Sequence, residues 1–295
     1  MYPGEFDLHE AGSVEEALSL LAEHDDVETE LLAGGHSLLP TMKTGLASPD
    51  VVIDIGQVDE MSGVSVDGDT VSIGATTTYA EVASSGAVQD HAPVVAEAAG
   101  AIGDTQVRNM GTIGGNVAHA DPASDLPGAV IAANADVVVR GPDGERSVPA
   151  EEFFMGMYAT DVGPGELVTR IDLPAADDAV GVYEKKASPS SGYAIVGLAA
   201  QVAVDGGTVS SASVAANGAM DHGVRLPAVE DAIAGESLDD DAIAAAASHA
   251  TDDLDETMMM ADIQASAEFR ANLLELYTER ALSRIADGAG GAAAD

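Results

Sequence analysis

Cysteine and tryptophan are both absent from the 295 residues, and aromatic side chains make up only 3%. Without cysteine the chain forms no disulfide, no thiolate zinc site and no protein-ligated iron–sulfur cluster. Its seven histidines are scattered and include no H-x-x-x-H pair beside a glutamate, so the sequence carries no metal signature. Any iron–sulfur relay that serves this chain therefore has to lie on another chain.

Positive charge is also scarce. Lys and Arg total 11 against 51 Asp and Glu, for a formal net charge of -40. Like charges repel, which excludes nucleic acid and anionic membrane surfaces as partners of the bulk surface. Apolar residues make up 46%, so we predict a folded protein rather than an acidic disordered one. The excess of acidic side chains over lysine is typical of a halophile's cytosol, where salt screens self-repulsion.

Long hydrophobic runs are missing as well, so we predict no membrane insertion. The first six residues lack the basic segment and the apolar run of a secretory signal. We therefore expect a soluble, cytoplasmic protein.

Two glycine-rich segments stand out, at residues 31–40 and 105–125. Glycine lacks Cβ and permits positive φ, so backbone can press against a ligand and consecutive N–H groups can converge on a phosphate. In the second segment Thr112, Asn116 and Asp125 add a hydroxyl, an amide and a carboxylate for a ribose or phosphate. Two such segments predict a ligand with two phosphates. Neither segment is a G-x-G-x-x-G fingerprint, and the sequence contains no P-loop.

The order of elements predicts an α+β protein of three units. Residues 1–56 form the first, a small α/β unit in which a capping box at residues 13–16 opens a helix. Its strands are predicted at residues 29–33 and 51–55.

Residues 57–175 form the second unit. The pattern predicts a hairpin over residues 64–73, helical sequence from the capping box at Thr78 to Ile102, a glycine loop, a helix over residues 126–133, a hairpin over residues 136–148 and a strand over residues 167–173.

Residues 176–286 form the third unit, after a short linker. We predict strands at residues 180–185, 194–204 and 208–215, followed by helices at residues 228–234, 241–249 and 263–285. The glycine- and alanine-rich residues 287–295 are predicted to be a disordered tail.

The two glycine segments resemble those of a known family. Ala-Gly-Gly-His-Ser-Leu-Leu-Pro at residues 33–40, and Thr-Ile-Gly-Gly-Asn at residues 112–116 after Ile-Gly-Asp at residues 102–104, resemble the FAD-binding subunit of molybdenum hydroxylases. That group includes the medium subunit of aerobic carbon monoxide dehydrogenases and the flavin subunit of xanthine dehydrogenases. The resemblance extends from Phe6 to about Ile285, nearly the whole chain.

The resemblance implies a fold and a function. The fold is a two-lobed, PCMH-type FAD-binding domain, followed by a C-terminal domain of a three-stranded antiparallel sheet with helices. In such complexes a molybdenum-cofactor large subunit oxidises the substrate. Electrons cross the [2Fe-2S] clusters of a small subunit to FAD, which delivers them to NAD, a quinone or oxygen. This chain is then the flavin subunit, with no catalytic side chain and no metal.

The resemblance also implies site residues. Residues of the first lobe would hold the FAD pyrophosphate, namely Ala33, Gly34, Gly35, His36, Ser37 and Leu38. Residues of the second would hold it from the other side, namely Thr112, Gly114, Gly115 and Asn116, with Asp125 reaching the ribose or pyrophosphate. Four further residues would lie near the isoalloxazine: Ile102, Leu167 through its backbone, Lys186 and Tyr193.

Several residues keep alternatives. Gly34 and Gly35 alone fit an ordinary turn, and His36 could carry covalent flavin, although a neutral, backbone-anchored histidine is the preferred interpretation. Lys185 could point inward instead of Lys186, and Tyr193 could be a core aromatic.

Two rival functions also stay open. One is a self-contained FAD oxidase or reductase, for which the sequence offers no convincing base, and the other is a non-catalytic dinucleotide-binding module. If a partner docks, we expect it near residues 118–127 and 258–260.

Overall fold

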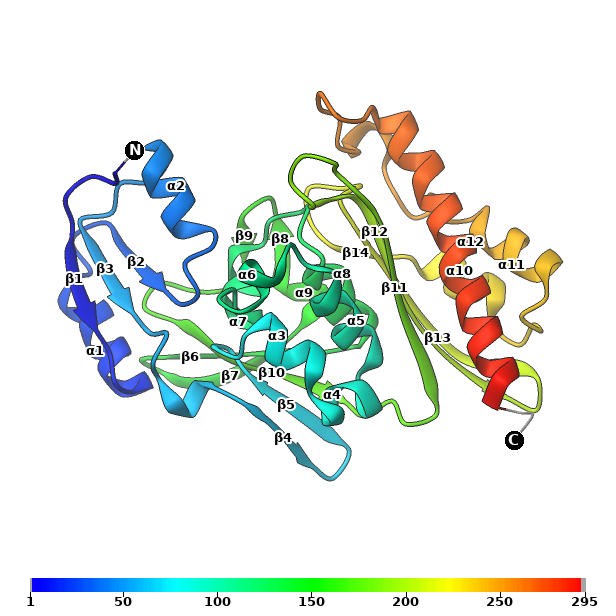
Figure 1. The fold of residues 1–295 in the computed structure, drawn as a ribbon, viewed down its shortest axis with the longest axis horizontal. Coiled ribbons are helices and arrows are strands. Elements are labelled where there is room, and N and C mark those ends of the chain that lie inside the picture. Colours follow the sequence, from blue (N-terminus) through cyan, green and yellow to red (C-terminus); the bar gives the residue numbers. More distant parts are fainter. Residues whose placement is uncertain (1, 293–295) are drawn as a thin grey trace.

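The computed structural model describes residues 2–292, with side chains as far as residue 288. Three main sheets follow one another along the longest axis of the molecule, in chain order (Figure 1). The first belongs to the N-terminal lobe, the second to the central lobe and the third to the C-terminal part. Within the described residues, no helix has both the length and the apolar character that a bilayer crossing requires.

The first lobe is a parallel sheet with two helices. Its strand order is β1 (Asp7–Glu10), β3 (Val51–Asp54) and β2 (Thr29–Leu32), and both outer strands run parallel to β3. The central strand is apolar and buried, as expected for a strand between two others. The helices are α1 (Val14–Glu23) and α2 (Leu38–Thr44).

The start of α1 was predicted correctly, with one difference. The Ser13 hydroxyl accepts a hydrogen bond from the Glu16 N–H at 3.1 Å, as a helix N-cap should. The Glu16 carboxylate accepts from the Gly12 N–H at 2.9 Å, instead of from Ser13. The reciprocal contact of a capping box is therefore displaced by one residue.

The second lobe is built on a five-stranded antiparallel sheet. Its strands are, in spatial order, β4 (Val64–Asp67), β5 (Thr70–Gly74), β10 (Leu167–Pro174), β6 (Asp136–Gly141) and β7 (Gly144–Pro149). Helices cover one face: α3 (Tyr79–Ser84), α4 (Gly86–His91), α5 (Pro93–Ala101), α6 (Thr105–Arg108), α7 (Ile113–His119), α8 (Leu126–Ala132) and α9 (Ala150–Phe153). Smaller elements are the 3-10 helix η1 (Asp59–Met61) and the paired strands β8 (Phe154–Gly156) and β9 (Ala159–Thr160).

Two features of this lobe differ from the prediction. The helical sequence from Thr78 to Ile102 is three helices, because the Ser85 hydroxyl caps α4 and Pro93, which lacks an N–H, begins α5. The second glycine segment is not a loop, since α7 starts directly after Thr112. Helix propensity is low for glycine, and tertiary contacts overrule it here.

The C-terminal part is an antiparallel sheet packed against helices. The three predicted strands are present as β11 (Ala179–Ala187), β12 (Ala194–Asp205) and β13 (Thr208–Asn217), and β14 (Val224–Arg225) adds a two-residue edge strand beside β13. The helical elements are α10 (Pro227–Ile233), α11 (Asp240–Ala247), η2 (Glu256–Met258) and α12 (Ala267–Ala292), of which α12 lies across β11 and β12 (Figure 1).

The disordered tail was placed wrongly. Helix α12 continues to Ala292, so residues 287–292 are helical, and residues 293–295 lie outside the described part of the chain. The apolar residues form two cores. One is shared by the first and second lobes, and the other fills the space between β11–β13 and α10–α12. The boundaries at residues 56 and 175 remain predictions.

A buried arginine ties α12 to the sheet beneath it. Arg270 is 3% exposed, and it donates hydrogen bonds to the carbonyls of Ile195 and Gly218 and to the Asp262 carboxylate at 2.8 Å. Ile195 and Gly218 are buried, so their carbonyls cannot regain water if the guanidinium is removed, whereas Asp262 is exposed.

We therefore expect Arg270→Met to lower the free energy of unfolding by about 3–5 kcal/mol, the range for breaking a buried ion pair. The control is Arg280→Met on the same helix, where the exposed guanidinium lies 5.0 Å from the centre of the Tyr277 ring. Its loss should cost less than about 1 kcal/mol. Denaturant unfolding at constant high salt measures both, and equal losses would contradict the assignment.

Candidate functional site

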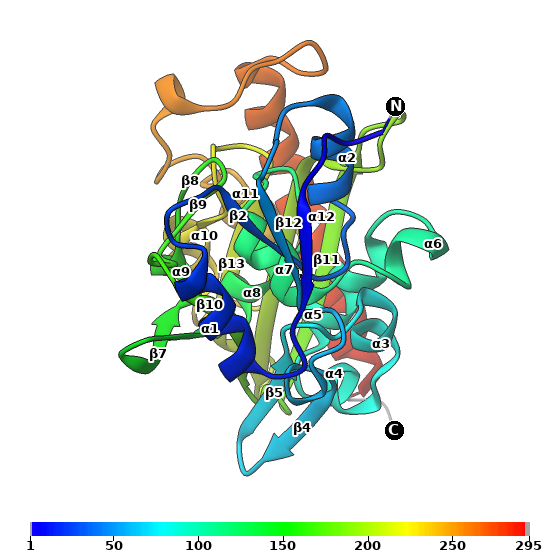
Figure 2. The same cartoon turned by 90° about the vertical axis from the view of Figure 1, so that its left-hand side faces the viewer.

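The two glycine segments meet backbone to backbone. Gly34, just after β2, lies against Met110 and Gly111 of the second lobe, and a Cβ on Gly34 would overlap the Met110 carbonyl. That same atom would lie 2.8 Å from the Gly111 Cα. Viewed from the side of the first lobe, β2 lies in front of α7 (Figure 2). Glycine at position 34 is therefore required for the two lobes to approach this closely.

A cavity of about 570 Å³ lies between the two lobes at this contact. Its size is within the usual range for small-molecule and cofactor sites. The predicted site residues in its wall are Ala33, Gly34, Gly35, His36, Ser37, Leu38, Thr112, Gly114, Gly115, Asn116 and Leu167. Among the described residues of the wall, none is lysine or arginine.

The first segment offers a run of free N–H groups. Within the described residues, no backbone or side-chain acceptor takes the N–H groups of residues 34–38. Gly35 has φ +72°, so it turns the backbone between β2 and α2 as a left-handed residue. Consecutive N–H groups in such a turn form a concave site for an anion. This segment has the geometry that a phosphate requires.

The second segment differs, because its first N–H groups are already used. Ile113 donates to the Thr77 carbonyl at 3.0 Å, and Gly114 donates to the Ala75 carbonyl at 2.9 Å. The Thr112 hydroxyl caps α7 by accepting from the Gly115 N–H at 3.3 Å. What this segment offers to a ligand is therefore a close glycine surface and side chains rather than a second run of free N–H groups.

Gly114 and Gly115 have different structural roles. A Cβ on Gly114 would overlap Ala75, so this glycine permits α7 to pack against the sheet. Gly115 is exposed on the cavity side, where a Cβ would lie 2.7 Å from the Thr112 Oγ1 and 3.8 Å from the Ala33 Cβ. Side-chain atoms beyond that Cβ would enter the space between the lobes.

Asn116 presents an unused acceptor. Its Nδ2 donates to the Tyr79 hydroxyl at 3.0 Å and to the Ser124 hydroxyl at 3.3 Å, while its buried Oδ1 has no partner within the described residues. Burial raises the pKa of Tyr79 to about 12, so its hydroxyl stays protonated at neutral pH. Buried polar atoms are rarely left unpaired, so this Oδ1 atom is a candidate acceptor for a ligand donor.

Asp125 lies away from the cavity, in a buried network with the C-terminal part. It is 4% exposed at the start of α8, and it accepts from the Tyr183 hydroxyl at 2.6 Å and from the Lys185 Nζ at 2.7 Å. Lys185 also donates to the Gly192 carbonyl at 3.0 Å. Asp125 is not in the cavity wall, and its contact with a ribose or pyrophosphate remains a prediction.

Lys186 is exposed and also lies outside the cavity wall, so its contact with the flavin remains a prediction. Alternate residues of a strand face opposite sides, so Tyr183 and Lys185 of β11 share the inner face and Lys186 faces solvent. The lysine that points inward is the neighbour, Lys185, and its partner is Asp125 rather than a ring system.

Ile102 and Tyr193 are not in the cavity wall either. Ile102 is a core residue after α5, and its carbonyl accepts from Arg108 at 2.9 Å. Tyr193 is 41% exposed on the loop between β11 and β12, where its carbonyl accepts from the Ser188 N–H at 2.7 Å. For these two residues a cofactor contact remains a prediction.

The wall also contains residues that the sequence analysis missed. The rings of His119 and Tyr158 lie 5.1 Å apart, and burial lowers the pKa of His119. Ala120 and Tyr158 have positive φ and are joined by a hydrogen bond from the Tyr158 N–H to the Ala120 carbonyl at 3.1 Å. His119 falls within the second glycine segment and could have been found there. Nothing local in the sequence identifies Tyr158 or Tyr79.

The family match is specific. Residues 4–176 match the family described as the FAD binding domain in molybdopterin dehydrogenase, and residues 182–285 match the CO dehydrogenase flavoprotein C-terminal domain. The chain belongs to the FAD-binding subunits of the molybdenum hydroxylases. The predicted family, fold class and FAD cofactor of this flavin subunit are confirmed.

Relatives of the flavin subunit span its whole length. The glyceraldehyde dehydrogenase medium chain of Sulfolobus acidocaldarius is 37% identical over 286 residues, which cover 97% of this chain and 100% of the relative. The carbon monoxide dehydrogenase medium chain of Hydrogenophaga pseudoflava is 37% identical over 284 residues, covering 96% and 98%. A solved structure of that organism's carbon monoxide dehydrogenase superposes with a TM-score of 0.91 at 38% identity, covering 97% of this chain and 98% of the other.

The two adjacent lysines of the flavin subunit form a matched test. Lys185→Met should lower the free energy of unfolding by about 3–5 kcal/mol, because it leaves the buried Asp125 charge without its partner. Lys186→Met removes the same charge from an exposed position and should change it by less than about 0.5 kcal/mol. Denaturant unfolding of both variants at one salt concentration compares them. A larger loss of unfolding free energy for Lys186→Met would contradict the inward position of Lys185.

A substitution at Gly115 tests whether FAD binds in this cavity. In Gly115→Val the branched side chain enters the cavity, so we expect FAD to bind at least about tenfold more weakly while far-UV circular dichroism stays unchanged. Gly86→Ala is the control, since its Cβ meets no atom within 4 Å and its φ is not positive. Flavin retained after ultrafiltration is the measurement. Full retention in Gly115→Val would place the cofactor elsewhere.

Proposed function

We propose that this chain is the flavin electron-transfer subunit of a three-subunit molybdenum hydroxylase, and that FAD binds in the cavity between its two lobes. The observation that carries the proposal is the run of free N–H groups at residues 34–38, which faces the Gly115 surface across that cavity. When bound, FAD supplies the redox chemistry, receiving electrons from a partner's iron–sulfur clusters and passing them to an external acceptor.

The residues of this chain bind and orient the cofactor. The N–H groups of residues 34–38 donate to the pyrophosphate, and Gly115 lets it approach the start of α7. The Asn116 Oδ1 accepts from a hydroxyl or N–H of the cofactor. Leu167, 2% exposed at the start of β10, forms a rigid part of the wall. No side chain of the chain needs to act as acid, base or nucleophile for this function.

The proposal requires partners. The chain has no cysteine for a cluster, so a small subunit with [2Fe-2S] clusters and a large subunit with the molybdenum cofactor must bring the electrons. Of the two docking segments predicted, residues 118–127 offer little surface, since Pro122 and Ala123 are hydrogen-bonded to the C-terminal part and α8 is buried. Met258 is 60% exposed and Met259 is buried, so only part of the other segment is available for a partner.

A self-contained FAD oxidase is the second candidate, and one observation favours it. His119 lies in the cavity wall, and burial holds its pKa below the usual value, so a neutral imidazole is present there at neutral pH. A neutral imidazole is the usual general base of an enzyme. The two candidates differ in whether the chain alone turns over an organic substrate.

The first test is purification from the native host in high salt, with an affinity tag after Asp295, beyond the end of α12. We expect a molybdenum subunit and a cysteine-rich subunit to co-purify, because this chain has no relay of its own. A lone flavoprotein that oxidises an organic substrate with normal turnover would establish the oxidase instead.

The second test concerns the flavin linkage. His36 is exposed, and its Nδ1 lies 3.2 Å from the Gly34 carbonyl oxygen, so its ring is anchored to its own backbone. We expect acid precipitation to release all of the yellow colour into the supernatant. Colour that stays in the pellet would identify a covalent bond, and its loss in His36→Ala would assign the bond to this residue.

We also propose that the chain works in the cytosol of a halophile. Its net charge of -40 destabilises the compact state by self-repulsion. Salt weakens this repulsion and also weakens the exposed ion pairs, but each such pair contributes only about 0–1 kcal/mol. The repulsion is therefore the larger of the two effects.

Stability should accordingly rise with salt. The screening length falls from about 10 Å at 0.1 M to about 3 Å at 1 M, so we expect the melting temperature to drop steeply below about 1 M salt. Thermal unfolding in KCl from low to multimolar concentration measures this. A melting temperature that is constant over that range would contradict the halophilic assignment.

A further inference from the structure

One arginine outside the cavity contacts the segment that forms part of its wall. Arg146 lies on the edge strand β7, and its guanidinium reaches the connection between β9 and β10. Nη1 donates to the Asp161 carboxylate at 2.7 Å, while Nε and Nη2 donate to the two Glu166 oxygens at 3.0 and 2.6 Å. Nη2 also donates to the Asp161 carbonyl. Arg146 itself is not part of the cavity wall.

The segment that Arg146 holds, residues 161–166, has no helix or strand of its own. Its internal contacts converge on Glu166, whose N–H donates to the Gly163 carbonyl at 3.1 Å and whose carboxylate accepts from the Gly163 N–H at 2.7 Å. Gly165 has φ +73°. The Asp161 N–H also donates to the Phe153 carbonyl at 2.9 Å, and Val162 packs against the core. Because no ladder holds residues 162–166, the guanidinium and these few contacts determine where the segment lies.

The same segment leads directly into the cavity. Residues 165–168 are all in the wall, and β10 begins at Leu167. A Cβ on Gly141 would lie 2.7 Å from the Glu166 Cγ, so this glycine gives Glu166 the room to reach Arg146. A shift of residues 161–166 would therefore move the wall at Gly165 and Glu166, whereas Leu167 is paired with Arg140 in the ladder between β10 and β6.

We propose that Arg146 is a positioning residue that fixes residues 161–166, of which Gly165 and Glu166 line the cofactor cavity, and so sets the environment of the bound FAD. This inference rests on the proposed binding of FAD between the lobes. A bidentate arginine–carboxylate contact with a second carboxylate is stronger than an isolated surface pair, and its directional hydrogen bonds persist in high salt.

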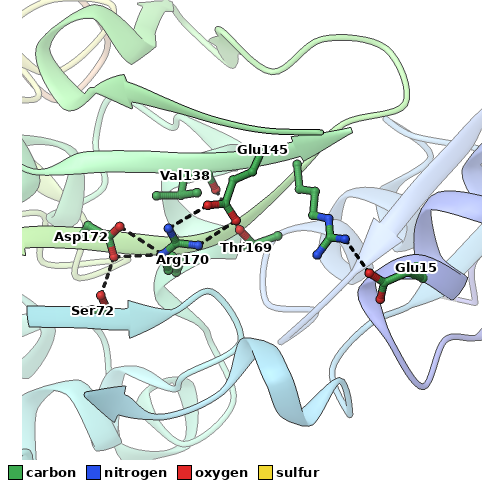
Figure 3. Close-up of polar contacts among 8 residues, drawn as sticks. Glu15, Ser72, Val138, Glu145, Thr169, Arg170 and Asp172 are labelled. Atoms are coloured by element: carbon green, nitrogen blue, oxygen red, sulfur yellow. Dashed lines mark hydrogen bonds and ion pairs between the residues drawn. The ribbon is translucent and has the colours of Figure 1, made fainter. Parts of the chain in front are cut away.

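The chain contains a matched control. Arg170 on β10 makes a similar set of contacts, bidentate to Glu145 at 2.8 and 2.9 Å and to Asp172 at 3.0 and 3.1 Å (Figure 3). Arg170 lines a second, smaller cavity. It is not in the wall of the cavity between the lobes. The backbone at Arg170 is held by ladders to β5 and β6, so its position does not depend on its own guanidinium.

The first measurement is hydrogen exchange of the FAD-free chain. Arg146→Gln should raise the exchange rate of the hydrogen-bonded amides of Asp161, Gly163 and Glu166 by about tenfold or more, the effect of losing charge-assisted hydrogen bonds. Arg170→Gln should leave the exchange of these amides unchanged. Unchanged exchange in Arg146→Gln would overturn the positioning role, whatever the location of FAD.

The second measurement uses the purified complex with FAD. Arg146→Gln should change the flavin absorption spectrum and reduction potential and weaken FAD binding, Arg146→Lys should restore them in part, and Arg170→Gln should leave them as in the wild type. Equal changes in both Gln variants would show general destabilisation and overturn the proposal. If exchange of the Asp161, Gly163 and Glu166 amides rises in Arg146→Gln while every flavin property stays unchanged, the proposed location of FAD has failed instead.

Discussion

The structure depends on a small number of positive charges placed between segments that the sequence separates widely. Within the described part of the chain, seven of the eleven lysines and arginines form ion pairs. They are Arg140, Arg146, Arg170, Lys185, Arg225, Arg270 and Arg284. Arg140 reaches Glu15 across the two lobes, and Arg284 of α12 reaches Glu97 of α5. Because the excess of acidic side chains repels itself elsewhere on the chain, these ion pairs offset a repulsion that a neutral protein does not have.

The position of the cavity follows from the contact between the two lobes. The lobes share one apolar core, and their backbones touch at Gly34 and Gly111, so the space between the glycine segments is bounded by rigid elements. The C-terminal part is joined to the second lobe through the buried contacts of Asp125. The proposed cofactor position lies between two segments that belong to one packed unit, while the third part fixes the region around α8.

Much of this could be predicted from the sequence, because local patterns determine it. The hairpins around Gly68 and Gly144, the capping box at Thr78 and the three long strands after residue 178 are all present. The glycine motifs identified the family and part of the cavity wall. What could not be predicted depends on contacts distant in sequence. Asp125 meets Lys185 across 60 residues, and the choice between Lys185 and Lys186 depends on which face of β11 turns inward.

Other differences also have physical causes. Helix α7 has two glycines in its first turn, so its sequence indicates a loop, and only its hydrogen bonds to Thr77 and Ala75 make it a helix start. The strand β14 is too short to produce a pattern. The last turns of α12 are rich in glycine, and low propensity alone did not end the helix there.

The composition of the cavity wall has one more consequence, which concerns how an anion is bound at high ionic strength. Lysine and arginine are absent from the described wall residues, and the groups that face a phosphate are neutral peptide dipoles at residues 34–38. Attraction between full charges weakens as ions accumulate around them, whereas short hydrogen bonds from a fixed backbone are hardly affected by ionic strength. The proposed cofactor site thus offers a phosphate contacts that concentrated salt hardly weakens.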